Sequence, residues 1–100
     1  MAQLIVVFWR DIPAQVIVKA GRQTAKRELP ERFVQAIDAA AMRSGAASTD
    51  DYLADWRRAD PVPCGDDLEA EADAAMARLV AEYDKPRILE LVNNQGRAAG

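Results

Sequence analysis

Cys64 is the one thiol in the chain and the first side chain whose type could support covalent chemistry. It lies just before a predicted helix, where the helix dipole can lower a thiol pKa, but Asp66 and Asp67 oppose that effect. The sequence contains no histidine, which excludes imidazole bases and Ser-His-Asp or Cys-His sites. A single cysteine also excludes an internal disulfide. We therefore expect Cys64 to be an inert loop residue, with a redox, metal or thiol contact as the alternative.

An acidic cluster follows Cys64 and is a candidate divalent-cation site, because hard cations are coordinated by carboxylate oxygens. Its members are Asp66, Asp67, Glu69, Glu71 and Asp73. The spacing lacks the glycine-bearing loop of an EF-hand, and on a helix these side chains spread over more than one face. We expect helix capping and a solvated surface here, and no metal site or bound cofactor.

A basic segment between residues 19 and 32 is the sharper candidate for ligand binding. Its cations are Lys19, Arg22, Lys26, Arg27 and Arg32. Arginine forks and a nearby helix N-terminus both favour anions, so Arg22, Lys26, Arg27 and Arg32 form a candidate anion-binding or cofactor-phosphate site. Glu28 and Glu31 would neutralise part of it, and no glycine-rich phosphate loop is present. The alternative is a solvated or partner-facing linker.

An aromatic and charged group, Trp9, Arg10 and Asp11, follows Phe8 at a predicted turn, and interfaces favour this composition. We identify these three residues as candidate partner-binding residues. Trp56, with two arginines after it, offers a second such group. The alternative for both tryptophans is burial in or over the core.

The elements that must position these residues begin with two strands. Residues 4–9 are a β-branched and aromatic run, and a second apolar run covers residues 15–19. Residues 10–14 supply Asp and Pro between them, so we expect an antiparallel hairpin that ends at Gly21.

Four helices are expected after the hairpin. The first begins at Leu29 or Pro30 and stops at Gly45, and the second runs from Ser48 or Thr49 to Arg58. A third is capped by Asp66, and a short fourth is capped by Asp84 and extends through Val92. The prediction is a single α+β domain over residues 1–92, with three to four helices packed on an N-terminal β-hairpin and a flexible C-terminal tail at 93–100.

The predicted hairpin is apolar at nearly every position, so both of its faces need cover. Helices can cover one face. The other face, or the free edge, must be covered by the last helix, by a second copy of the chain or by a partner protein. This requirement is the main structural argument for a binding role.

Composition limits the remaining classes of function. A chain of 100 residues forms one domain, and its longest apolar run, Leu4–Trp9, is far too short to span a membrane. No basic segment precedes that run, so we expect a cytoplasmic protein without a secretory signal. Residues 1–50 carry seven cations and five anions, whereas residues 51–100 carry six and eleven. The net charge of −3 argues against tight nucleic-acid binding.

Three segments together carry a resemblance to a known family. They are VVFWRDIPAQVIVKAGR, KRELPERFVQAIDAAAMRSGA and TDDYLADWRR. The chain resembles, over roughly residues 3–90, the small bacterial domain family described as "virulence factor". In that family the hairpin motif at Trp9–Val16 and the helix motif at Leu29–Asp38 recur. The short form is similar to stand-alone alphaproteobacterial copies, and that likeness implies an accessory protein beside a folate- or corrinoid-dependent methyltransferase.

The expected function is therefore a non-catalytic cytoplasmic module that binds another protein, or itself as a homodimer, through Trp9, Arg10 and Asp11. The alternative is a small-molecule or cofactor-phosphate binder that uses the basic segment. An enzyme is disfavoured because the sequence contains no histidine and shows no nucleophile–base pair. Membrane and nucleic-acid partners are not expected.

Overall fold

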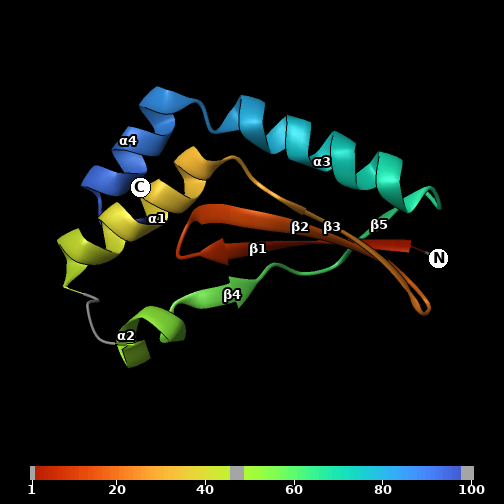
Figure 1. Ribbon diagram of the computed structural model, residues 1–100, viewed down its shortest axis with the longest axis horizontal. Helices are drawn as coiled ribbons and strands as arrows, with labels where there is room; N and C mark the ends of the chain where they lie inside the picture. The colour runs from red at the N-terminus through yellow and green to blue at the C-terminus, as the bar shows by residue number, and fades with distance from the viewer. Residues whose placement is uncertain (1, 46–48, 98–100) are drawn as a thin grey trace.

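The structure is a computed structural model that describes residues 2–45 and 49–97. A five-stranded antiparallel sheet carries helices on one of its faces (Figure 1). The elements in chain order are β1 (Ala2–Trp9), β2 (Ile12–Ala20), β3 (Gln23–Glu28), α1 (Glu31–Ser44), α2 (Thr49–Ala54), β4 (Trp56–Arg58), β5 (Val62–Cys64), α3 (Leu68–Glu82) and α4 (Lys85–Asn93). The fold is α+β, as the sequence predicts.

Strand β1 is the centre of the sheet because it pairs with three other strands. On one side it pairs with β2, which pairs with β3 in turn; on the other side it pairs with β4 at its C-terminal half and with β5 at its N-terminal half. The β1–β2 register shifts between Val7 and Phe8, so that one extra residue, Ala14, stands on β2. The predicted hairpin is confirmed, and Gly21 ends its second strand with a φ of 60°.

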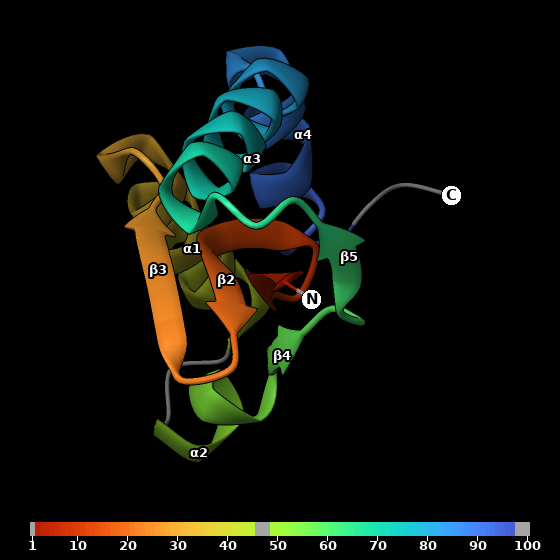
Figure 2. The same ribbon diagram turned by 90° about the vertical axis from the view of Figure 1, so that its right-hand side faces the viewer.

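Helices α3, α1 and α4 cover one face of the sheet. Helix α3 packs on β2 and β3, α1 packs on β2, and α4 packs against α1. Figure 2 shows α3 and α4 above the strands, and α2 at the bottom of the view, next to strand β4. The core between sheet and helices is apolar, and its members include Val16, Val18, Phe33, Ile37, Ala72, Ala75 and Leu79.

The helix ends follow the expected capping chemistry, with one correction. Gly45 ends α1 in the left-handed conformation, with its N–H donating to Ala41 and Met42 carbonyls. The Asp84 side chain accepts from the Arg87 N–H at the start of α4, as predicted. At α3 the cap is Asp67, which accepts from the Ala70 N–H, and not Asp66. Ser48, the expected cap of the second helix, lies outside the described residues.

Three segments differ from the prediction because strand pairing overrides local pattern. Val62–Cys64, expected to be a loop that contains Cys64, is strand β5 and pairs with β1. Residues 23–28 are an edge strand, not a linker, and the single apolar residue among them, Ala25, faces the helices. Trp56–Arg58 is strand β4, not the end of a helix, since its backbone pairs with β1.

The segment expected to be a flexible tail is held against the body through residue 97. Gly96 is buried, its carbonyl accepts from the Asp11 N–H at 2.8 Å, and the Gln95 carbonyl accepts from Arg10 Nη1 at 2.7 Å. These bonds join residues 95 and 96 of the segment predicted as a tail to the β1–β2 turn, while residues 98–100 lie outside the description.

Candidate functional site

The sheet face opposite α1, α3 and α4 is the part of the molecule that best resembles a binding surface. Cross-strand partners share a face and alternate residues along a strand point the same way, so the registers fix its composition. We call it the open face; it consists of Gln3, Ile5 and Val7 from β1, Gln15, Ile17 and Lys19 from β2, Thr24, Lys26 and Glu28 from β3, Arg58 from β4 and Pro63 from β5.

An apolar centre lies in the open face. Ile5, Val7 and Ile17 form a small cluster separate from the main core, with exposed fractions of 7%, 9% and 2%. In the described part of the chain, the partly buried apolar residue packed against this cluster is Trp56. Strand neighbours with long polar side chains surround it, so the second face of the sheet is covered by its own rim and one indole, without a helix.

A groove opens at one end of the open face, next to the indole of Trp56. We call it the Trp56 groove; its volume is about 270 Å³, and its lining is Val7, Ala14, Gln15, Glu28, Val34 and Trp56. Val34 comes from the outer side of α1 and is 49% exposed. The groove is thus a mostly apolar hollow between β1, β2, α1 and β4. The Gln15 amide and the Glu28 carboxylate, the latter at the end of β3, are the polar groups of its wall.

A chain of aromatic contacts positions Trp56 from the core. The Trp9 and Tyr52 rings stack at 5.8 Å between centroids, and the Tyr52 and Trp56 rings meet edge to face at 5.8 Å. Burial, together with the Asp38 carboxylate, raises the pKa of the Tyr52 hydroxyl. Trp56 is half-buried, as one reading of the sequence expected.

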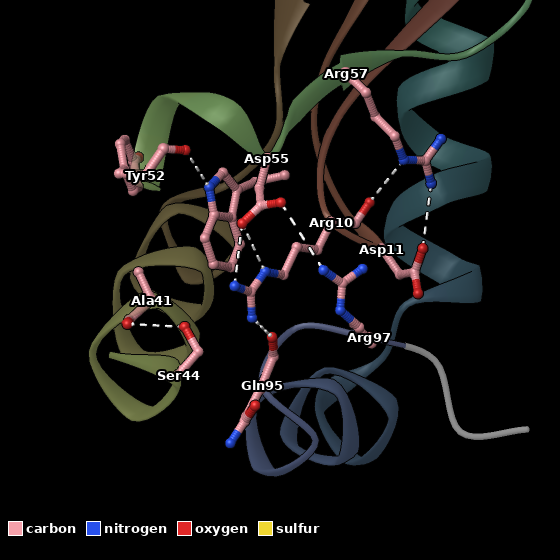
Figure 3. A network of polar contacts seen from close by, with 10 residues as sticks. Arg10, Asp11, Ala41, Ser44, Tyr52, Asp55, Arg57, Gln95 and Arg97 are labelled. Atoms are coloured by element: carbon pink, nitrogen blue, oxygen red, sulfur yellow. Dashed lines mark hydrogen bonds and ion pairs between the residues drawn. The ribbon is translucent and has the colours of Figure 1, made fainter. Parts of the chain in front are cut away.

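Trp9 and Arg10 lie inside the molecule, which corrects their prediction as direct partner contacts. Trp9 is fully buried, and its Nε1 donates to the Tyr52 carbonyl. The Arg10 side chain is only 11% exposed, and its guanidinium binds the Asp55 carboxylate and the Gln95 carbonyl (Figure 3). Both side chains are held by internal partners because the β1–β2 turn packs between α2 and the C-terminal segment.

Asp11, the third predicted partner residue, stays at the surface beside Arg57. Its Oδ1 accepts from Arg57 Nη2 at 3.2 Å, and Arg57 also stacks over Phe8 at 4.6 Å and donates to the Arg10 carbonyl. Figure 3 shows this pair at the edge of the network around Arg10.

The four cations proposed as an anion site do not converge. Arg27 faces α3, where it pairs with Glu69 and with Asp73, the latter at 2.7 Å; these two hydrogen bonds raise its pKa. Arg32 donates to carbonyls at the end of α3, those of Val80 and Tyr83. Lys26 projects from the opposite face of β3, and Arg22 lies in the β2–β3 turn.

A second hollow, of about 420 Å³, lies between β3 and the start of α3. Its lining is Gln23, Thr24, Asp66, Asp67, Leu68 and Glu69. Three carboxylates on this wall would repel a phosphate, so the hollow does not supply the missing anion site. Across residues 2–45 and 49–97, no group of three or more His, Cys, Asp or Glu side chains could hold a metal ion.

Cys64 ends β5 with its side chain partly buried. Burial raises the pKa of its thiol, and the Glu71 and Asp66 carboxylates raise it further. A helix dipole therefore does not activate this cysteine, and the thiolate is disfavoured at neutral pH.

Comparison with known proteins places the chain in a family. The family model described as "Virulence factor" matches residues 7–92. The chain belongs to the Virulence factor family. This match confirms the resemblance, and the matched range includes all the residues that line the Trp56 groove. No curated protein and no solved structure matches the chain. None of the helices that the structure describes has the length and hydropathy needed to cross a membrane.

Sequence reasoning missed the open face because it did not assign β3 and β4. Without these strands, Lys26 and Arg58 belong to a linker and a helix, and nothing places them beside Ile5 and Ile17. The signal that could have found β3 is the alternation of exposed Thr24 and Lys26 around Ala25 after a glycine turn. A three-residue strand such as β4 leaves no comparable signal.

Proposed function

We propose that this chain is a non-catalytic accessory module that binds another protein in the bacterial cytoplasm through its open face. The observation that carries the proposal is the Trp56 groove, a mostly apolar hollow that adjoins the buried cluster of Ile5, Val7 and Ile17. An apolar hollow with a polar rim and an aromatic residue in its wall is typical of protein interaction sites.

The lack of catalytic equipment supports a non-catalytic role. Histidine is absent from the chain, and the pKa of the Cys64 thiol is raised, so the one cysteine is a poor nucleophile at neutral pH. The residues with the strongest polar contacts, Arg10 and Asp55, bind each other and the backbone. Chemistry in which the chain takes part would then be performed by its partner.

The resemblance to short alphaproteobacterial family members suggests the identity of the partner system. On that basis we include a folate- or corrinoid-dependent methyltransferase as the partner to test first. The alternative function, a cofactor-phosphate binder, has less support, because Arg27 and Arg32 are held by α3 and Lys26 points to the other side of the sheet.

Capture with two matched variants of α1 tests the proposed function. Val34 and Met42 are both exposed apolar residues of α1, at 49% and 79%, but only Val34 is among the residues that line the groove. Wild-type protein, Val34→Glu and Met42→Glu are each immobilised and exposed to lysate from the cell of origin. We expect one specific protein to be retained by the wild type and by Met42→Glu, and lost with Val34→Glu. Equal retention by all three proteins would contradict the proposal.

A further inference from the structure

We propose that the occupant of the open face is an acidic segment of a partner protein that places one apolar side chain in the Trp56 groove. This inference rests on the proposed function and specifies the chemistry of its partner. It follows from the charges around the apolar centre, from the lack of ion-pair partners for its cations among the described residues, and from the size of the groove.

The charged side chains of the open face are mostly cationic. Lys19, Lys26 and Arg58 are positive and Glu28 is negative, which gives the face a charge of +2. The whole chain has a net charge of −3, so the face is opposite in sign to the molecule that carries it. Such a separation of charge attracts an anionic partner to this face and orients it during association.

The cations of the open face are available to a partner, unlike several arginines elsewhere. Arg10, Arg27 and Arg57 are in ion pairs, and Arg32 donates to two backbone carbonyls. For Lys19, Lys26 and Arg58, the described part of the chain provides no carboxylate within ion-pair distance. A partner's carboxylates would therefore gain these contacts without breaking an internal pair.

The cations are arranged around the apolar centre. In the strand registers Lys26 stands beside Ile17, Lys19 is the next residue of this face along β2, and Arg58 stands beside Val7. Lys26 borders the centre on the β3 side, Lys19 at the end of β2 that leads into the β2–β3 turn, and Arg58 on the β4 side. A segment that crosses the face with its apolar side chain in the Trp56 groove thus runs beside cations that lie on three sides of the centre.

The groove fits a single side chain better than a free ligand. Its volume of about 270 Å³ lies below the range of about 300–1,000 Å³ that is usual for small-molecule pockets. Val7, Ala14, Val34 and Trp56 give it an apolar wall that suits one leucine or phenylalanine anchor.

The same charges argue against two other occupants. In a two-fold dimer through this face, Lys19, Lys26 and Arg58 would meet their own copies, and like charges in an interface are unfavourable. Nucleic acid would also be attracted by cations, but single-strand binding uses several aromatic rings that stack successive bases, and the aromatic ring packed against this aliphatic centre in the described residues is that of Trp56. An acidic protein segment satisfies both the charges and the apolar centre.

Synthetic peptides and charge-reversal variants test the inference. The probe is a peptide of aspartate and glutamate with one central leucine; its controls are the same peptide with asparagine and glutamine, and single-stranded oligothymidylate. Binding is followed by the NMR signals of the Trp56 indole and of the backbone amides. Wild type is compared with K26E/R58E, with the milder K26Q/R58Q, and with R78E, which changes an exposed arginine of α3.

We expect the acidic peptide to shift the Trp56 indole signal and the amide signals of the open face, with affinity that falls as salt is raised. The neutral peptide and K26E/R58E should each bind at least tenfold more weakly, K26Q/R58Q should be intermediate, and R78E should match wild type. Equal binding of the acidic and neutral peptides, tighter binding of oligothymidylate, or self-association lost in K26E/R58E would each overturn the inference. If Val34→Glu abolishes capture but the acidic peptide does not bind, the proposed function stands and this inference fails.

Discussion

The indole Nε1 of Trp9 donates a 2.8 Å hydrogen bond to the backbone carbonyl of Tyr52, which lies 43 residues later in the chain. The bond ties the end of β1 to α2, and the Tyr52 ring in turn packs against Trp56. The core and the groove are therefore coupled through one buried indole.

Replacement of that indole should destabilise the whole domain. Trp9 is fully buried, and Trp9→Ala removes a large core side chain and leaves the Tyr52 carbonyl without its donor, so we expect a loss of about 3–5 kcal/mol in the free energy of unfolding. Leu89→Ala, at a residue that is 59% exposed, should change it by less than about 0.5 kcal/mol. Urea unfolding followed by circular dichroism measures both, and equal stability of the two variants would refute the role given to Trp9.

Gly96 should not tolerate a side chain. Its φ is +86°, and a Cβ there would lie 3.0 Å from Trp9 Cζ3 and 3.3 Å from Arg10 Cδ. Gly45 provides a matched control, since its φ is +78° but nothing lies within 4 Å of its Cβ position. Both alanine variants carry a left-handed backbone cost of about 1 kcal/mol, and Gly96→Ala adds a steric clash. We expect Gly96→Ala to have a lower Tm than Gly45→Ala; the opposite order would show that residues 95–97 do not pack as described.

The carboxylate of Asp55 should contribute more than that of Asp11. Asp55 Oδ2 lies 3.1 Å from both Nε and Nη2 of Arg10, whose side chain is 11% exposed, whereas Asp11 pairs with Arg57, whose side chain is 50% exposed. Asp55→Asn should cost about 1–3 kcal/mol of unfolding free energy, and Asp11→Asn at most about 1 kcal/mol. Denaturant titrations at low and high salt distinguish them, because only the exposed pair should weaken markedly with salt. Equal costs would contradict the burial of Arg10.

Cys64 should react slowly with alkylating reagents at neutral pH. Burial and the Glu71 and Asp66 carboxylates raise its thiol pKa, so the thiolate fraction is lower than in a free cysteine. Glu71→Gln removes one negative charge, so the pKa should fall and iodoacetamide should react faster at a given pH. Glu82→Gln, at the far end of α3, is the control and should leave the rate unchanged. A pH–rate profile with a midpoint at or below the ordinary cysteine value would refute this assignment.

The parts of the fold that the sequence predicts are those set by local pattern. The β1–β2 hairpin follows from two β-branched runs around Pro13, and α1 follows from the apolar spacing that begins at Phe33 and ends at Gly45. Strands β3 and β4 could not be predicted in the same way, since Ala25 is the one apolar residue of β3 and β4 has three residues. Both form because β2 and β1 each offer a backbone edge with which the new strand pairs.

The candidate site was predictable in part. The sequence predicts that both faces of the apolar hairpin need cover, and the cluster of Ile5, Val7 and Ile17 is the apolar part of the second face, where Trp56 packs against it. Which residues border it could not be derived, because Lys26, Val34 and Arg58 reach the face only through tertiary pairing of β3, α1 and β4. The prediction of Trp9 and Arg10 as partner contacts has a related cause. An aromatic and a charged residue at a turn suit a protein interface and a buried junction equally well. The residue that binds the Arg10 guanidinium from the C-terminal segment is Gln95, 85 positions later in the sequence.

Photo-crosslinking in living cells tests the central claim, that the open face binds another protein, most directly. A photoreactive amino acid replaces Gln15, which lines the Trp56 groove, or Arg78 on the outside of α3. The account predicts a single discrete crosslinked protein from position 15, absent from position 78 and lost when Val34→Glu is added. Crosslinks from position 78 alone, or none from position 15 with the protein folded and expressed, would contradict it.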